Sequence, residues 1–209
     1  MFEIQNFIAF LAASILIILA PGPAQALVLA RTIGSGRKSG IMTAIGLNVG
    51  TLFHAVAAGL GLSAVLATSA LAFSVVKLAG AAYLVYLGLR AVLTRPAAIT
   101  ETDPLAERSD HAFLKAVVTG VLNPKVALFF LAFLPQFVDQ KRGSAFLQFA
   151  VLGSIIAAID IVYESILAFI AGGISGRVMN NARVRIWRER ITGLALIGLG
   201  VRLALIKRS

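Results

Sequence analysis

The tripeptide Pro21-Gly22-Pro23 stands inside an apolar run that would otherwise form one helix. No residue between Ile4 and Ala30 carries a charge, and a run of this length can cross a bilayer. Proline removes a backbone donor and its ring clashes with the preceding turn, so the helix must be interrupted here. Inside hydrocarbon, freed backbone groups persist only where protein or a water-filled cavity satisfies them. The interruption is therefore either a packing kink or a binding site.

The composition is that of an integral membrane protein. Of 209 residues, 59% are hydrophobic and 13% are charged, and the mean hydropathy is +0.92. Soluble domains average about 45–50% apolar and about 25% charged residues. The net charge of +10 does not indicate a nucleic-acid partner, because the basic residues form short runs between apolar segments. No basic residue precedes the first apolar run, so we expect a span there rather than a cleaved signal peptide.

Hydropathy divides the chain into six predicted transmembrane helices. The stretch from Ser39 to Val76 is uncharged except for His54, which is too long for one span of about 20–25 residues, so we expect a turn near Thr68-Ser69. The fourth span is interrupted at Asn123-Pro124-Lys125 and ends at Pro135. The predicted spans cover residues 4–30, 41–66, 71–93, 113–135, 144–172 and 190–206.

The basic residues predict the orientation of these spans, because cytoplasmic loops carry an excess of lysine and arginine. One side of the membrane would hold Arg31, Arg37, Lys38, Arg90, Arg95, Arg108, Lys115, Arg177, Arg183, Arg185, Arg188 and Arg190. The other would hold only Lys141, Arg142, Arg202, Lys207 and Arg208. The larger group favours the cytoplasm, which leaves both termini outside the cytoplasm.

The two halves of the chain resemble each other at a shift of 103 residues. The matching pairs are Pro21 with Pro124, Gly40 with Gly143, and Gly50 with Gly153. We therefore expect a single transmembrane transporter domain over residues 1–209, with repeats at about 1–93 and 112–209 joined by a polar loop at 94–111. Three spans per half is an odd number, so the second repeat would be inverted. Paired, interrupted helices in inverted halves are typical of secondary transporters with a site between the repeats.

Each interruption starts a new helix, whose first N–H groups are unpaired and carry the positive end of the dipole. Such an end suits an anionic group, for instance a substrate carboxylate. A single interruption is more simply a structural kink, whereas the pair favours a binding role. The candidate substrate-binding residues are Pro21, Gly22, Pro23, Asn123, Pro124, Lys125 and, from the next span, Asp160.

Charged groups at membrane depth are the second functional signal. A charge at the centre of a spanning helix costs about 2.5–3.5 kcal/mol on insertion scales, so each needs a partner or a function. Asp160 lies near the middle of the fifth span, and Glu164 follows one turn later. Lys125 either neutralises Asp160 or has a functional role, in which it holds an anion or takes part in a proton relay. His54 is either a hydrogen-bonded packing residue or a proton carrier. Asp160, His54 and Glu164 are the proton-coupling candidates.

Several motifs follow one another along the chain: Pro21-Gly22-Pro23, Gly46 to His54, Lys77 to Gly88, Asn123-Pro124-Lys125 with Pro135-Gln136-Phe137, and Asp160. In this order they resemble the LysE/RhtB family of amino-acid exporters. The resemblance implies a multi-pass exporter in the bacterial inner membrane, acting on amino acids such as lysine, threonine, homoserine or leucine. It also implies that the proton gradient drives export. We expect Asp160 to receive the substrate ammonium group or to carry the coupling proton, while Glu164 could serve a basic substrate.

Two alternatives belong to other classes of protein. An intramembrane enzyme acting on lipid could use Asp160, Glu164 and His54 as acid and base, but no nucleophile motif accompanies them. A structural or assembly protein would leave the buried acids and paired interruptions unexplained. With two histidines and no cysteine, we expect no metal centre and no cofactor. The expected partners are an amino-acid substrate and the lipid bilayer, and a homo-oligomer is left open.

Overall fold

The computed structural model describes residues 3–20, 22–68, 70–93, 109–139, 142–173 and 182–205, and all regular structure in these ranges is helical. Pro21, Ser69 and most of the polar loop at 94–111 lie outside the described residues. The helices are α1 (Ile4–Leu19), α2 (Pro23–Ser35), α3 (Arg37–Thr68), α4 (Ala70–Leu93), α5 (Ser109–Val121), α6 (Pro124–Leu128), the π-helix η1 (Phe129–Phe133), the 3₁₀-helix η2 (Leu134–Phe137), α7 (Ala145–Ala171) and α9 (Ala182–Leu205).

Three segments among the described residues are long and apolar enough to cross a membrane. They are Arg37–Gly61, Phe113–Phe137 and Ala145–Ala171. A fourth span is formed if α1 and α2, which meet at an angle of 55°, count as one broken helix. Helix α4 carries a shorter apolar stretch, Leu78–Arg90. The prediction of an all-α membrane protein is confirmed, and the six-span repeat layout stays a prediction.

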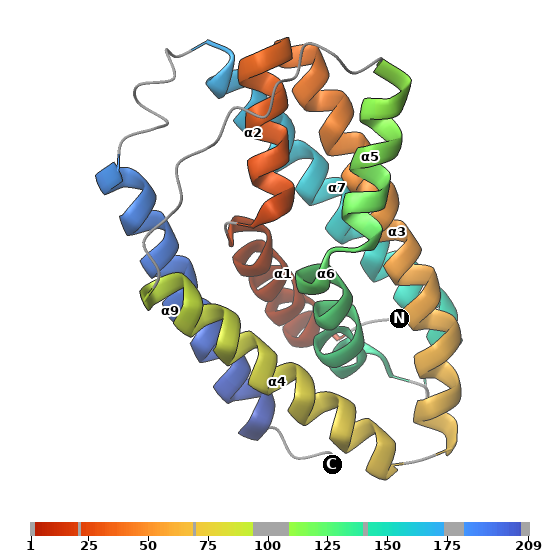
Figure 1. The fold of residues 1–209 in the computed structure, drawn as a ribbon. Coiled ribbons are helices and arrows are strands. Elements are labelled where there is room, and N and C mark those ends of the chain that lie inside the picture. Colours follow the sequence, from red (N-terminus) through yellow and green to blue (C-terminus); the bar gives the residue numbers. More distant parts are fainter. Residues whose placement is uncertain are drawn as a thin grey trace.

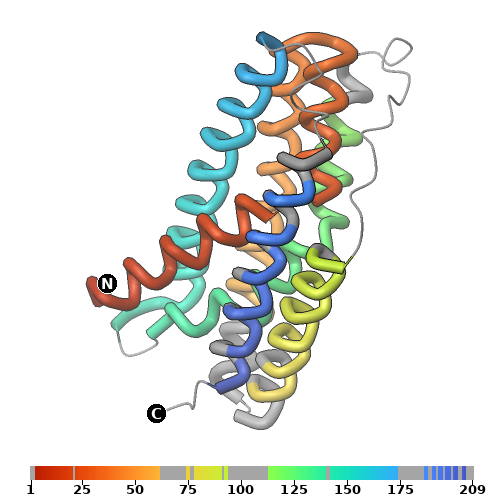
Figure 2. The backbone as a smooth tube through the Cα atoms, turned by 90° about the vertical axis from the view of Figure 1, so that its left-hand side faces the viewer, coloured from red at the N-terminus to blue at the C-terminus, as the bar shows by residue number. Residues whose placement is uncertain are grey.

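The helices pack in pairs that join the two halves of the chain. Helix α3 lies against α7 and α4 lies against α9, and the members of each pair run in opposite directions (Figure 1). These are the second and third spans of each predicted repeat. The core between them contains fully buried aromatic and aliphatic side chains from α1, η1 and α7, among them Phe10, Phe130, Phe149 and Leu152. The beginning of α1 and the end of α9 lie in the same half of the bundle (Figure 2).

Charged side chains make contacts at each end of the bundle, ion pairs at one end and a cation–π contact at the other. Arg142, just before α7, forms an ion pair with Glu3 at the beginning of α1 and another with Asp139 at 3.1 Å. At the opposite end, the guanidinium of Arg37 lies 4.5 Å from the centre of the Phe169 ring. Exposed pairs contribute little stability, but they show which ends of α1, α3 and α7 lie together.

The observed bounds differ from the predicted ones mainly in α9. This helix begins at Ala182, eight residues before the predicted start at 190, and therefore includes Arg183, Arg185 and Arg188. Arginine has high helix propensity and its charge can remain in water at the end of a span. Hydropathy alone therefore misses this first part of the helix. The predicted turn near Thr68-Ser69 agrees with the end of α3 at Thr68 and the start of α4 at Ala70.

Candidate functional site

The first interruption separates α1 from α2. Pro23 occupies the first turn of α2, where its missing N–H costs nothing, and Gly22 before it is extended, with φ −163°. No side chain caps the start of α2. The end of α1 presents carbonyls without helical partners. The Ile18 carbonyl accepts a hydrogen bond of 2.5 Å from Nε2 of Gln25, so α2 reaches back across the interruption.

Lys125 contacts two further carbonyls at the end of α1. Its Nζ donates to the carbonyl of Ala20 at 2.8 Å and to that of Ile17 at 3.1 Å. Lys125 itself belongs to the second interruption, in the other half of the sequence. The end of α1 and the start of α6 accordingly lie side by side in the middle of the bundle (Figure 1). The two interruptions predicted from proline positions are thus in direct contact.

The second interruption, between α5 and α6, is built differently from the first. Asn123 is the N-cap of α6, its side chain is 3% exposed, and its Oδ1 accepts a hydrogen bond of 3.1 Å from the backbone N–H of Lys125. Helix α6 has only five residues and continues into the π-helix η1 and the 3₁₀-helix η2. Isolated π-turns are rare and are often found at functional sites. Because Asn123 already caps α6, the start of α2 is the freer of the two helix starts.

Two acids on α7 face this region. Asp160 and Glu164 are one helical turn apart, and both act electrostatically on Lys125. Glu164 is 1% exposed, and its Oε2 has no hydrogen-bond partner among the described residues. Asn48 of α3, also buried, lies close to the Asp160 carboxyl group, and its Nδ2 donates to the Ala44 carbonyl at 3.1 Å. The site therefore gathers one lysine and two carboxyl groups from α6 and α7.

His54 lies next to the second interruption rather than next to the two acids of α7. Its imidazole lies within hydrogen-bonding reach of the backbone at Gly120 and Val121, in the last turn of α5. This approach is close because a Cβ on Gly50, one turn earlier on α3, would overlap the same backbone. The Phe130 ring of η1 lies 6.3 Å from the imidazole, between ring centres. His54 is thus placed at the carbonyl end of α5, much as Lys125 is placed at that of α1.

Sequence reasoning missed two residues of this region, Gln25 and Asn48. Each is a polar residue in an apolar helix, and Gln25 follows Pro23 by two positions. That local signal was available, but amide side chains are common in helices and carry no charge to draw attention. In the described part of the chain, no group of three or more histidine and acidic residues could hold a metal ion.

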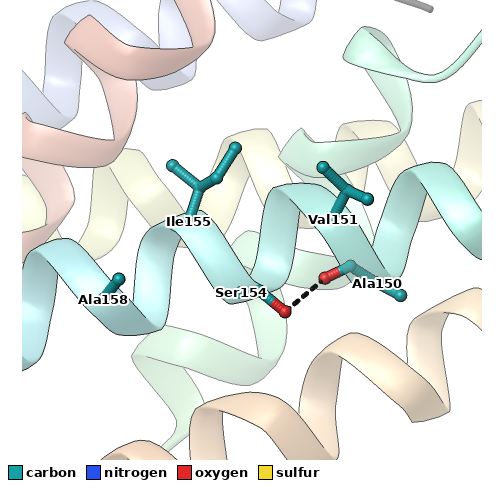
Figure 3. Close-up of a pocket in the computed structure, with 5 residues that line it drawn as sticks. All are labelled: Ala150, Val151, Ser154, Ile155 and Ala158. Carbon is teal, nitrogen blue, oxygen red and sulfur yellow. Dashed lines mark hydrogen bonds between the residues drawn. The ribbon is translucent and has the colours of Figure 1, made fainter.

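A shallow hollow on α7 lies apart from the interruptions. Ala150, Val151, Ser154, Ile155 and Ala158 line it (Figure 3). Its one hydroxyl, that of Ser154, donates to the Ala150 carbonyl at 2.8 Å and so has a partner. The hollow is apolar and offers no group that would orient a charged ligand, so the polar cluster at the interruptions is the stronger candidate.

Comparison with known proteins gives a consistent result along the whole chain. A family model described as LysE type translocator matches residues 15–207. A membrane protein of Vibrio cholerae is 34% identical over 206 residues, covering 98% of this chain and 99% of the relative. A leucine efflux protein of Klebsiella pneumoniae is 29% identical over 209 residues, covering 99% and 98%. A similar protein of Enterobacter, also named leucine efflux protein, is 29% identical over 206 residues, with 97% of each chain covered. No solved structure matches the chain.

Proposed function

This chain belongs to the family of LysE type translocators, and from that premise we propose that it exports amino acids across the bacterial inner membrane, driven by the proton gradient. Members of the family are transporters and not enzymes, which removes the lipid-modifying enzyme from consideration. The chain is a multi-pass membrane protein with apolar helices of spanning length. The substrate, the coupling ion and the sidedness are the parts that we propose.

The contact between the two interruptions is the observation that carries the proposal. The uncapped start of α2 offers backbone N–H groups and a positive dipole end to a carboxylate. Asp160 and Glu164 on α7 offer negative charge to an ammonium group near the same place. A zwitterionic amino acid carries both groups on one carbon, so it fits a site where a helix start and buried acids lie close together.

We assign the substrate class from the relatives. Two of the similar proteins are named leucine efflux protein, and leucine would be bound by its carboxylate and ammonium groups with an apolar side chain toward the aromatic core. Lys125 offsets one of the two acids on α7, which leaves little reason to require a second positive charge on the substrate. A neutral, apolar amino acid is therefore preferred over a basic one.

We assign proton coupling to Asp160. Lys125 acts on it electrostatically and Asn48 lies close to its carboxyl group, so its protonation would change the charge balance around the site. Glu164 and His54 are secondary candidates, because Glu164 lies one turn further along α7 and His54 lies at the end of α5.

The test is leucine transport in proteoliposomes, with proton movement followed by a pH-sensitive dye. We expect leucine flux to drive protons in the opposite direction in the wild type and both fluxes to be lost in Asp160→Asn. Glu3→Gln, which removes an exposed acid at the start of α1, is the matched control and should behave as the wild type. Full leucine-for-proton exchange by Asp160→Asn would exclude the assigned role. Parallel flux measurements with lysine and threonine decide the substrate class.

A further inference from the structure

The carbonyl end of α1 has the features of a binding site for a primary ammonium group. The last carbonyls of a helix lack helical partners and carry the negative end of its dipole. At membrane depth no bulk water is available to satisfy them. Two carbonyls at this end, those of Ile17 and Ala20, accept from one nitrogen atom, the Nζ of Lys125, at 3.1 and 2.8 Å, and that of Ile17 also accepts from the Ala20 N–H at 3.2 Å. The two distances to Nζ are ordinary lengths for an ammonium donating to a carbonyl.

Two further buried acceptors belong to residues that bond to the end of α1 or act on Lys125. An ammonium group has three N–H donors, and two of them are accounted for by Ile17 and Ala20. Buried oxygens without a hydrogen-bond partner in the described part of the chain include Oε1 of Gln25 and Oε2 of Glu164. Both residues are at most 3% exposed. Buried polar atoms usually have partners, and an unpaired one needs a reason. A ligand that carries N–H donors would supply it.

Two acids and one lysine belong to the same region. Asp160 and Glu164 both act on Lys125, so two acids face one lysine when both are ionised. Gly22 lies beside the Lys125 head group, since a Cβ at this position would lie 3.6 Å from its Nζ. The lysine stem is flexible and can carry its head group away from the carbonyls.

We propose that the carbonyl end of α1 is an ammonium subsite, occupied in turn by Lys125 and by the amino group of the substrate. This inference rests on the proposed function for the identity of the substrate. It assigns the amino group to the carbonyls of Ile17 and Ala20, with the carboxylate at the start of α2 on the other side of the same interruption. Lys125 then acts as an internal stand-in for the substrate, and it bridges the two halves only while the amino group is elsewhere.

The first test measures binding without transport. Lys125→Ala removes the internal ammonium group, and methylammonium is the probe that replaces it. We expect methylammonium chloride to raise the thermal unfolding midpoint of purified Lys125→Ala in detergent in a saturable way. Tetramethylammonium chloride, which has no N–H donor, should have no such effect. The wild type and Lys115→Ala, which removes an exposed lysine of the same predicted span, should not respond to either salt. No stabilisation of Lys125→Ala by methylammonium would overturn the subsite.

The second test uses leucine efflux from proteoliposomes. Lys125→Ala should lower the rate by about tenfold or more, the scale of one charge-assisted hydrogen bond, and methylammonium should restore a large part of it. A variant with undiminished efflux would overturn the proposal. If the wild type transports no amino acid, the proposed function fails, and the thermal measurement still decides whether the carbonyls bind an ammonium group.

A third measurement covers the case in which Lys125→Ala does not fold. In the wild type, saturating leucine should increase the rate at which Lys125 is modified by reductive methylation, because the substrate displaces its amine from the carbonyls. Peptide mass spectrometry reports this rate, with Lys115 as the internal reference. An unchanged rate for Lys125 in the presence of bound leucine would contradict the exchange of the two groups.

Discussion

Two basic side chains lie against helix ends that belong to the opposite half of the chain. Lys125 of the second half donates to carbonyls at the end of α1. His54 of the first half lies within hydrogen-bonding reach of the backbone at the end of α5. Each interruption frees carbonyls that need donors in a membrane, and in both cases a basic side chain from the other half of the chain lies near them. At the scale of residues, Lys125 therefore joins the two interruptions by hydrogen bonds, and His54 lies close to the end of α5.

The N-cap of α6 gives a prediction at this scale. Replacing Asn123 by alanine removes the acceptor for the Lys125 N–H, which should cost about 0.5–2 kcal/mol. For a chain of this length, each kcal/mol lost from the free energy of unfolding lowers the unfolding midpoint by about 2–4 °C. Thermal unfolding in detergent checks the shift. Asn123→Ser keeps a capping oxygen and should recover most of the loss, while an equal loss in both variants would show that the cap is not the cause.

At the scale of elements, the interruption between α1 and α2 is the feature with most consequences. It turns the chain by 55°, and the end of α1 lies beside the start of α6. Proline at the start of α2 explains the break locally, and the contacts with Gln25 and Lys125 explain how its carbonyls are satisfied.

Healing this interruption tests its role. In the double variant Pro21→Ala, Pro23→Ala, a continuous helix would pair the carbonyls that Lys125 now contacts. We expect membrane insertion to be unchanged and leucine export to be abolished, as measured by protein level in membranes and by efflux. Pro96→Ala with Pro104→Ala, two prolines of the polar loop, is the matched control. Undiminished export from the double variant would demote the interruption to a packing kink.

The seam between α3 and α5 gives a second prediction for elements. A Cβ on Gly50 would overlap the backbone of Gly120 and Val121. Gly50→Ala should therefore force the two helices apart, at a cost of about 1–3 kcal/mol, and move His54 away from the end of α5. Gly61→Ala on the same helix meets nothing within 4 Å and should be neutral or stabilising by about 0.5–1 kcal/mol. Unfolding midpoints of the two variants make the comparison, and equal midpoints would contradict the close backbone approach.

At the scale of the whole molecule, the pairs α3 with α7 and α4 with α9 hold the two halves together (Figure 1). Glycines allow the second pair to approach closely, since a Cβ at Gly88 would overlap the backbone of α9 and one at Gly200 that of α4. Small residues at such contacts are typical of helix packing in membranes. If these two helix pairs stay rigid during transport, the interrupted helices are the parts that rearrange.

The orientation of the whole chain in the membrane can be tested directly. The distribution of basic residues favours both termini outside the cytoplasm. Because the chain has no cysteine, single variants such as Gln5→Cys and Ser209→Cys can be labelled in intact cells with a membrane-impermeant maleimide. We expect both to react, and Thr102→Cys in the polar loop to react only after lysis. Labelling of Thr102→Cys alone in intact cells would reverse the orientation.

The sequence by itself determined the features that depend on local physics. Apolar length predicted the helices, proline predicted both interruptions, and position within an apolar run marked Asp160, Glu164, Lys125 and His54 as costly residues with a role. These signals are local, because helix formation and membrane insertion are decided largely by each segment and its flanks.

Only the tertiary structure decided which groups meet. Lys125 donates to carbonyls that lie 105 and 108 positions earlier in the chain, and no local pattern encodes a partner at that distance. The sequence suggested Asp160 or an anion as its partner, because charge is visible in a sequence and a freed backbone carbonyl is not. Gln25 and Asn48 were missed for the same reason. The packing of the two halves joins the two interruptions, because it brings the Lys125 ammonium group of the second to the carbonyls of Ile17 and Ala20 at the first.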